Sequence, residues 1–261
     1  MTYLRQRLYG FVKYQPLLRE LILRDIKVRY RHSFLGMIWT VLNPLLMMIV
    51  LSIVFSNMFR MNIENFPVYV LIGQIVFNCN AEATTQSMNS IVWNASLIKK
   101  VYIPKYLFPL SNVLSCLVNF AFSFVALILV MLFTRAPFYL TLLTTWIPLL
   151  YLVIFAFGLS LILCTFNIFF RDMQHLYSVF TTAWMYLSAL FYSIEIVPPA
   201  LLPVIQANPL YQFISFFRQI IMEGTFPDIY TNLTCLLTAV AMLVVGLFTF
   251  AKLQDRFILH I

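Results

Sequence analysis

Long uncharged stretches alternate with short charged segments along most of this chain. The uncharged stretches cover residues 32–59, 106–134, 136–170, 173–194 and 229–251. One more stretch, 66–93, is apolar apart from Glu82. About 20 apolar residues are needed for a helix to cross the hydrocarbon core of a bilayer. The pattern therefore predicts an all-α integral membrane protein with six transmembrane helices.

A seventh uncharged stretch, 196–217, differs from the others because it is rich in proline. Its prolines are Pro198, Pro199, Pro203 and Pro209. Each proline removes a backbone donor and disrupts a helix, and lipid offers no substitute partner. We interpret the segment 195–224 as short re-entrant helices that enter the outer face of the membrane and return.

Composition and charge agree with this class. The chain has 261 residues, of which 62% are hydrophobic and 10% charged, whereas soluble domains have about 45–50% apolar and about 25% charged residues. The net charge of +8 does not indicate nucleic-acid binding. Its basic residues lie beside apolar stretches, where they mark cytoplasmic loops and contacts with anionic lipid.

The distribution of basic residues predicts the orientation. With the N-terminus inside, six spans leave four cytoplasmic segments, namely 1–31, 94–105, 171–175 and 252–261. These segments contain every Lys and Arg except Arg60, Arg135 and Arg218. A seventh crossing would place Lys252 and Arg256 outside, against the positive-inside rule. We therefore expect six spans with both termini in the cytoplasm.

Two cytoplasmic segments have amphipathic patterns. Segment 1–31 divides at Pro16, which is well placed to start a second helix, and the part before it fits a helix on the inner leaflet. On one helical face after it lie Arg24, Lys27 and Arg31. This face fits a solvated surface and a docking surface equally well.

The second segment, 94–105, combines an apolar side with three lysines. Its apolar side is Leu97, Ile98, Val101 and Tyr102, and its lysines are Lys99, Lys100 and Lys105. Pro104 should end any helix near Ile103. A short helix of this kind can lie on the membrane or dock into a partner's groove, and the residues alone do not favour docking.

Polar and aromatic residues recur inside two predicted spans. The second span carries Asn78, Glu82, Thr85, Gln86 and Asn89 on one helical stripe, which suits either an aqueous path or hydrogen bonds between helices. The fifth span carries Tyr177, Phe180, Trp184, Ser188 and Phe191 at spacings of 3, 4, 4 and 3. Such rings can stack on sugars, although packing between helices is the commoner reason for them.

The sequence offers no bond chemistry of its own. We find no phosphate-binding loop, zinc-protease or nucleophile-elbow motif. The three histidines and four cysteines are dispersed, and the acidic residues are scattered. We therefore expect no catalytic residues, no metal site and no cofactor in this chain.

Four segments together resemble a known family. They are "LRDIKVRYRHSFLGMIWTVLNPLL" (23–46), "LIKKVYIPKYLFPLS" (97–111), "FNIFFRDMQH" (166–175) and "NPLYQFISFFRQIIMEG" (208–224). In this order and on this topology, the chain resembles over its whole length the permease subunit of bacterial ABC transporters that export polysaccharides. That family includes the exporters of O-antigen, capsule and teichoic acid.

The resemblance implies a single permease domain, 1–261, in the bacterial inner or plasma membrane. It implies a homodimer, bound to two copies of a cytoplasmic ATPase that holds ATP and Mg²⁺, and a lipid-linked glycan as the substrate. Segment 94–105 becomes the coupling helix, with the basic N-terminal face as a second contact. The coupling residues implied are Ser96, Leu97, Ile98, Lys99, Lys100, Val101, Tyr102, Arg24, Lys27 and Arg31.

The same resemblance implies a substrate channel and an outer gate. The channel residues would be Tyr177, Phe180, Trp184, Ser188, Phe191, Asn78, Glu82 and Gln86. The outer gate would comprise Pro198, Pro199, Pro203, Asn208, Pro209 and Arg218. The nearest alternative is an ABC permease for drugs or lipids, followed by an ion-driven carrier, which the single intramembrane carboxylate Glu82 supports weakly. A membrane-embedded transferase ranks below both.

Overall fold

The computed structural model describes residues 2–30, 36, 38–59 and 63–260 of the chain, and side chains at 14–28, 36, 38–54, 63–258 and 260. Within these ranges the chain forms helices and loops, without a strand. The prediction of an all-α fold is thus confirmed.

Six main helices occupy the six predicted apolar stretches. They are α2 (Ile38–Phe59), α3 (Phe66–Trp93), α5 (Leu107–Phe133), α6 (Trp146–Phe169), α7 (Met173–Tyr186) and α10 (Ile229–Leu253). Among the described residues, three helical stretches are long and apolar enough to cross a membrane, namely Leu107–Phe133, Leu140–Phe169 and Ile229–Arg256. The second of these includes the short helix η1 (Leu140–Thr144), which precedes α6.

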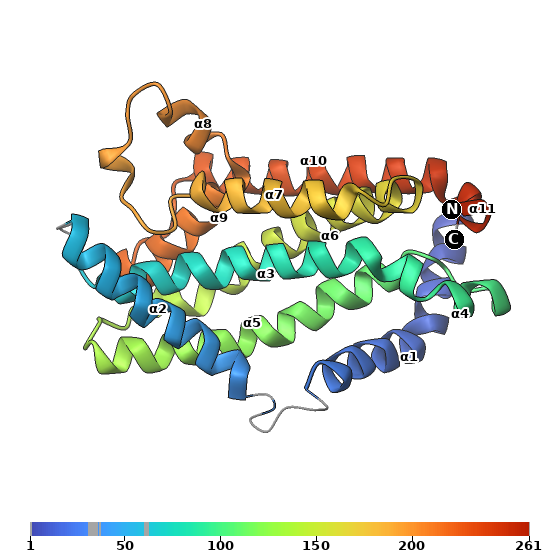
Figure 1. Ribbon diagram of the computed structural model, residues 1–261, viewed down its shortest axis with the longest axis horizontal. Helices are drawn as coiled ribbons and strands as arrows, with labels where there is room; N and C mark the ends of the chain where they lie inside the picture. The colour runs from blue at the N-terminus through green and yellow to red at the C-terminus, as the bar shows by residue number, and fades with distance from the viewer. Residues whose placement is uncertain (1, 31–35, 37, 60–62, 261) are drawn as a thin grey trace.

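The centre of the bundle is α3, which packs against both α5 and α6, while α6 packs against α10 (Figure 1). The last pair meets at two glycines. A Cβ atom on Gly246 would lie 2.2 Å from the carbonyl oxygen of Gly158. Small residues of this kind allow close backbone approach between membrane helices.

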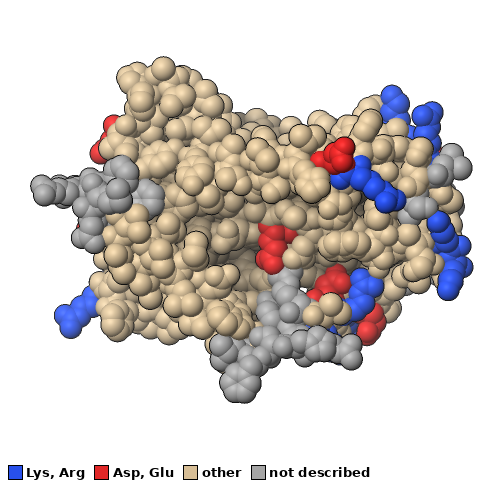
Figure 2. Space-filling model, viewed as in Figure 1, with Lys and Arg blue, Asp and Glu red and all other residues tan. Residues whose placement is uncertain are grey.

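The two ends of the molecule differ. Both termini and the short helix α4 (Ala95–Lys100) lie at one end, and α8 (Leu202–Gln206) lies at the other (Figure 1). Most Lys and Arg side chains on the face in Figure 2 gather at the end with the termini. We refer to these as the basic end and the outer end.

The N-terminal segment corrects one prediction, because α1 (Thr2–Tyr30) continues through Pro16 instead of dividing there. Figure 1 shows α1 changing direction along its length, as a helix bends where proline removes a hydrogen bond. Leu18 and Leu21 beyond the proline are buried in a cluster with residues of α5 such as Leu107. The second half of α1 is therefore packed against the rest of the protein.

The fifth predicted span, 173–194, is shorter than expected because α7 ends at Tyr186. Fourteen helical residues extend only about 21 Å, less than the roughly 30 Å of hydrocarbon. The chain then passes through η2 (Ile194–Ile196), α8, α9 (Pro209–Arg218) and the π-helical turn η3 (Gln219–Glu223) before α10. At the basic end, α10 is followed by η4 (Gln254–Arg256) and α11 (Phe257–His260).

Candidate functional site

A polar groove follows α3 between α2 and α7. Three hollows of about 440, 280 and 250 Å³ form it. The first two share Asn43, Pro44 and Asn78, and the first and third share Met185, so the hollows adjoin. Figure 2 shows this face hollowed, with acidic atoms in the recess. The groove is therefore a row of adjoining open hollows along α3 rather than a single closed pocket.

Glu82 is the charged group of this groove. It lines the 280 Å³ hollow together with Asn78 and Asn119. Asn119 Nδ2 lies 3.3 and 3.2 Å from the two carboxylate oxygens, and Gln86 Nε2 donates to Oε1 at 3.2 Å. These amides hold the carboxylate in place. Asn119 was not identified from the sequence, although Asn112, Ser115 and Ser123 of α5 recur with it at spacings of 3, 4 and 4.

The predicted polar stripe of α3 therefore has two destinations. Asn78, Glu82 and Thr85 line the groove. Asn89 is buried instead and accepts a hydrogen bond of 3.1 Å from Asn167 of α6. Bonding between helices is therefore observed at Asn89, while an aqueous path along Asn78, Glu82 and Thr85 stays a prediction.

The predicted stripe of the fifth span does not lie on one helix, because α7 ends at Tyr186, before Ser188 and Phe191. Tyr177 lines the groove near the basic end, is buried, and its hydroxyl lies 2.7 Å from that of Thr84. Phe180 is 53% exposed and stacks between Tyr177 and Trp184. Phe191 lines the groove from the loop beyond the helix, whereas Ser188 is fully buried.

Asn208, the N-cap of α9, explains why α7 ends where it does. Its Oδ1 accepts from Trp184 Nε1 at 2.7 Å and from the Leu210 amide at 3.0 Å. Its Nδ2 donates to the Leu187 carbonyl and to Ser188 Oγ, both at 3.0 Å. Carbonyls at the end of a helix need partners, and here a side chain from a distant helix supplies one.

Arg218, at the other end of α9, binds the same segment. Its guanidinium donates to the carbonyls of Ala189 at 3.1 Å, Leu190 at 3.0 Å and Tyr69 at 3.3 Å. The guanidinium carbon lies 3.3 Å from the centre of the Tyr69 ring. Both ends of α9 thus fasten to residues 187–190, and through Tyr69 to α3.

The prolines of this segment shape its short helices. Pro203 and Pro209 occupy the first turns of α8 and α9, where proline is favoured because its missing N–H is not needed. Pro198 and Pro199 lie exposed in the loop before α8.

At the basic end, α4 covers only 95–100, half of the predicted segment 94–105. Val101 is extended, since Pro104 disfavours helix in the residues before it. Ile98 is buried, whereas Ser96, Lys99 and Lys100 are exposed. Tyr102 is 90% exposed. The segment therefore presents a basic and partly apolar tip.

Asn94 connects this tip to the groove, because it ends α3 and begins α4. Its Nδ2 donates to the Ser90 carbonyl at 2.7 Å, and its Oδ1 accepts from Arg24 Nη1 at 3.0 Å. Arg24 also pairs with Asp25 at 3.0 Å. Lys27 is exposed on the same helix, and Arg31 lies outside the described residues.

Lys105 differs from the other two lysines because it turns inward. Its Nζ donates to the Gln254 carbonyl at 2.6 Å and lies 5.5 Å from the centre of the Phe257 ring. Burial lowers the pKa of Lys105 from its ordinary value, while the charge of Asp255 opposes the shift. Lys105 thus ties the tip to the C-terminal residues.

Comparisons with known proteins agree with the resemblance seen in the four sequence segments. Residues 16–222 match the ABC-2 type transporter family. The O-antigen export system permease protein RfbA of Klebsiella pneumoniae is 34% identical over 239 residues, 90% of each chain. RfbA of Myxococcus xanthus is 32% identical over 83% of this chain and 84% of its own. The polysialic acid transport protein KpsM of Escherichia coli is 24% identical over 82% of this chain and 84% of its own. The chain belongs to the ABC-2 type transporter membrane family.

Proposed function

We propose that this chain is the membrane-spanning permease subunit of an ATP-driven exporter that moves a lipid-linked polysaccharide out of the bacterial cytoplasm. One observation carries the proposal, namely the 34% identity over nine-tenths of both chains to an O-antigen export permease. The groove along α3 adds a polar path of the required kind.

In this proposal α2, α3, α5, α6 and α10 cross the inner or plasma membrane, α7 crosses it together with residues 187–194 that follow it, and the basic end faces the cytoplasm. The clustering of basic side chains at that end supports this orientation (Figure 2). The short helices of 195–224 then form an outer gate, held to the wall of the groove by Asn208 and Arg218.

The proposed assembly contains two permeases and two separate ATPases. Leu176 and Val179 of α7 are 66% and 72% exposed beside the groove, so a second copy facing the first would cover them and enclose one wide path. The Lys99–Tyr102 tip would dock into the ATPase, where an exposed aromatic ring and two lysines offer apolar and ionic contacts.

The lever follows from the connection at Asn94. When the ATPases close on ATP, they displace α4, and the hydrogen bonds of Asn94 pass this displacement to α3, the floor of the groove. Glu82, Asn78 and the α7 rings then face the passing glycan. This chain supplies the path and the lever, and the ATPase supplies the free energy.

Blocking the groove tests the proposal in the cell that makes the glycan. Asn78→Trp places a large ring in the groove, whereas Val244→Trp places the same ring on the exposed side of α10. We expect the first variant to lose surface glycan and retain lipid-linked glycan inside, at normal protein level, and the second to export normally. Normal export by Asn78→Trp would overturn the proposed path.

A further inference from the structure

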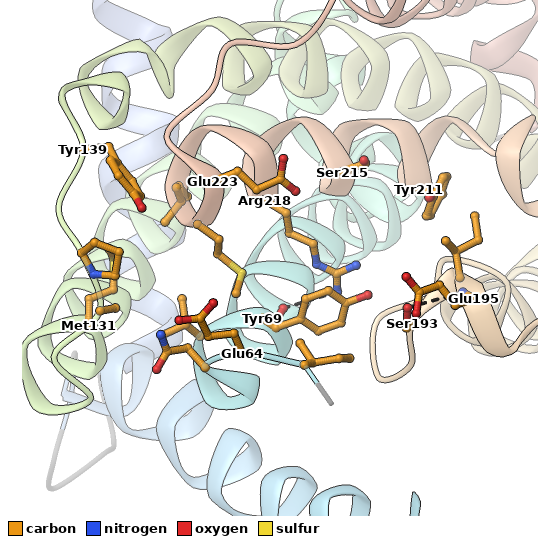
Figure 3. Close-up of a pocket in the computed structure, with 18 of the residues that line it drawn as sticks. Glu64, Tyr69, Met131, Tyr139, Ser193, Glu195, Tyr211, Ser215, Arg218 and Glu223 are labelled. Carbon is orange, nitrogen blue, oxygen red and sulfur yellow. Dashed lines mark hydrogen bonds between the residues drawn. The ribbon is translucent and has the colours of Figure 1, made fainter. Parts of the chain in front are cut away.

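A cavity of about 490 Å³ lies at the outer end, separate from the groove. Its walls come from the start of α3, the loop before η1, the loop around η2, and α9 with η3. Figure 3 shows side chains from these segments converging on one space, with Arg218 and Tyr69 near its middle. Among the residues that the structure describes, the cavity shares no lining residue with the three hollows of the groove.

The lining combines charged groups with phenol rings. The polar residues are Glu64, Glu195, Glu223, Arg218, Asn65, Tyr69, Tyr139, Tyr211, Ser193 and Ser215. Among the described lining residues, three carboxylates stand against one guanidinium, and this net negative set disfavours a phosphate or carboxylate ligand. Carboxylates accept hydrogen bonds and the other groups donate them, while the rings offer apolar faces. This set matches a ligand that carries hydroxyls on an apolar ring frame without charge.

Arg218 leaves part of its hydrogen-bonding capacity unused. The residue is 7% exposed, and its two terminal nitrogens bind backbone carbonyls. Its buried Nε finds no hydrogen-bond partner among the described residues. Within the same part of the chain Arg218 forms no ion pair with an acidic side chain. A buried donor without a partner is destabilising, and this one belongs to the wall of the cavity, because Arg218 is among its lining residues.

The backbone around the cavity is unusually constrained. Left-handed φ values occur at Asn65 (52°), Arg135 (54°), Ala189 (48°) and Gly224 (66°). Asn65 lines the cavity, Arg135 and Gly224 each adjoin a lining residue, and Ala189 binds Arg218. A Cβ on Gly224 would lie 2.5 Å from the Tyr139 ring, so glycine lets this ring form the wall. Such strain, like a π-helical turn, concentrates at functional sites.

We propose that this outer cavity binds one uncharged sugar residue of the glycan after it has left the groove. The carboxylates of Glu195 and Glu223 accept from sugar hydroxyls, Arg218 donates, and the rings of Tyr139 and Tyr211 contact the C–H faces. Because the bound sugar is held on the outer side, the cavity slows the backward movement of the glycan between successive cycles of ATP hydrolysis. The inference rests on the proposed function, since it takes the exported polysaccharide as its ligand.

Site-specific crosslinking in the exporting cell tests this second site. The photoreactive residue p-benzoylphenylalanine replaces Ile196, which is 56% exposed and lines the cavity, or Thr182, which lines the groove. Leu143 is the control, because it is 73% exposed on η1 and lines neither. After illumination, we expect periodate-reactive glycan attached to the purified protein when either Ile196 or Thr182 has been replaced. We expect none attached when Leu143 has been replaced.

The outcomes separate the two proposals. Adducts at Thr182 alone would overturn the outer site and leave the export function standing, whereas adducts at neither position in cells that display glycan would overturn both. An equal yield of adduct at Leu143 would show that crosslinking at Ile196 reflects only general closeness to exported glycan. This result would also overturn the outer site. Glu195→Gln with Glu223→Gln should weaken the Ile196 adduct and spare the Thr182 adduct, and an unchanged Ile196 adduct would contradict the assigned carboxylates.

Discussion

Asn208 concentrates at one residue the contacts that fix the outer gate. Replacing it by alanine removes the acceptor of Trp184 Nε1 and the donor to the Leu187 carbonyl. Each buried group left without a partner costs about 1–3 kcal/mol. We expect Asn208→Ala to lower clearly the midpoint of thermal unfolding of the purified protein, measured by tryptophan fluorescence. Export should fall as well.

The matched control for Asn208 is Gln206→Ala, two residues earlier, where the side chain is exposed. Its midpoint should remain that of the original protein. A midpoint for Asn208→Ala equal to that of the control would show that the hydrogen bonds around Trp184 do not hold α9 to the end of α7.

Two helices depend on backbone contact at Gly158 and Gly246. A methyl group on Gly246 would overlap the Gly158 carbonyl oxygen, so Gly246→Ala must push α6 and α10 apart. Overpacking of this kind typically destabilises by about 1–3 kcal/mol. We expect a lower unfolding midpoint for Gly246→Ala, while Val244→Leu, which adds bulk on the exposed side of α10, should leave it unchanged. Similar midpoints for both variants would contradict the close packing.

The position of these elements follows largely from local patterns, but their lengths do not. The apolar stretches and the prolines of 195–224 predicted where the main helices and the short ones occur. Residues 187–194 carry no charge, like the rest of the predicted span, so charge gives no sign that α7 ends at Tyr186. That end depends on Asn208 and Arg218, which lie about 20 to 30 residues further along the chain.

The candidate site shows the same division between local and tertiary information. Asn78 and Glu82 were identified because a polar residue inside a span is conspicuous. Asn119 and the inward turn of Lys105 depend on which helices become neighbours. Pro16 led to the opposite error, because it predicted a break where the structure has a continuous helix. Burial of Leu18 and Leu21 stabilises this helix, which the proline alone would interrupt.

At the scale of the whole molecule, the orientation can be tested by labelling. All four cysteines of the chain are free and buried, so an introduced exposed cysteine should be the reactive one. A membrane-impermeant maleimide should label Ala200→Cys, an exposed position in the loop before α8, in cells whose outer layers have been removed. It should label Lys100→Cys only after the membrane is opened. The opposite pattern would place the basic end outside and refute the six-span topology.

Helix α4 at the basic end is connected through Asn94 to α3, which runs along the groove. A change at the tip formed by Lys99–Tyr102 should therefore affect export by the whole molecule. Lys99→Glu with Lys100→Glu reverses two exposed charges on the tip, while Asn94 and the buried Ile98 keep the fold of α4 intact. If the tip is where an ATPase acts, this variant should reach the membrane normally, bind the ATPase less and stop exporting glycan. Lys252→Glu with Arg256→Glu makes the same charge change at exposed residues of the basic end outside the tip. Two measurements on both variants separate a specific contact from a general effect of charge, namely the amount of ATPase that co-purifies and the amount of glycan on the cell surface. Equal losses in both variants would mean that the basic end acts through its charge on lipid, and that α4 is no lever.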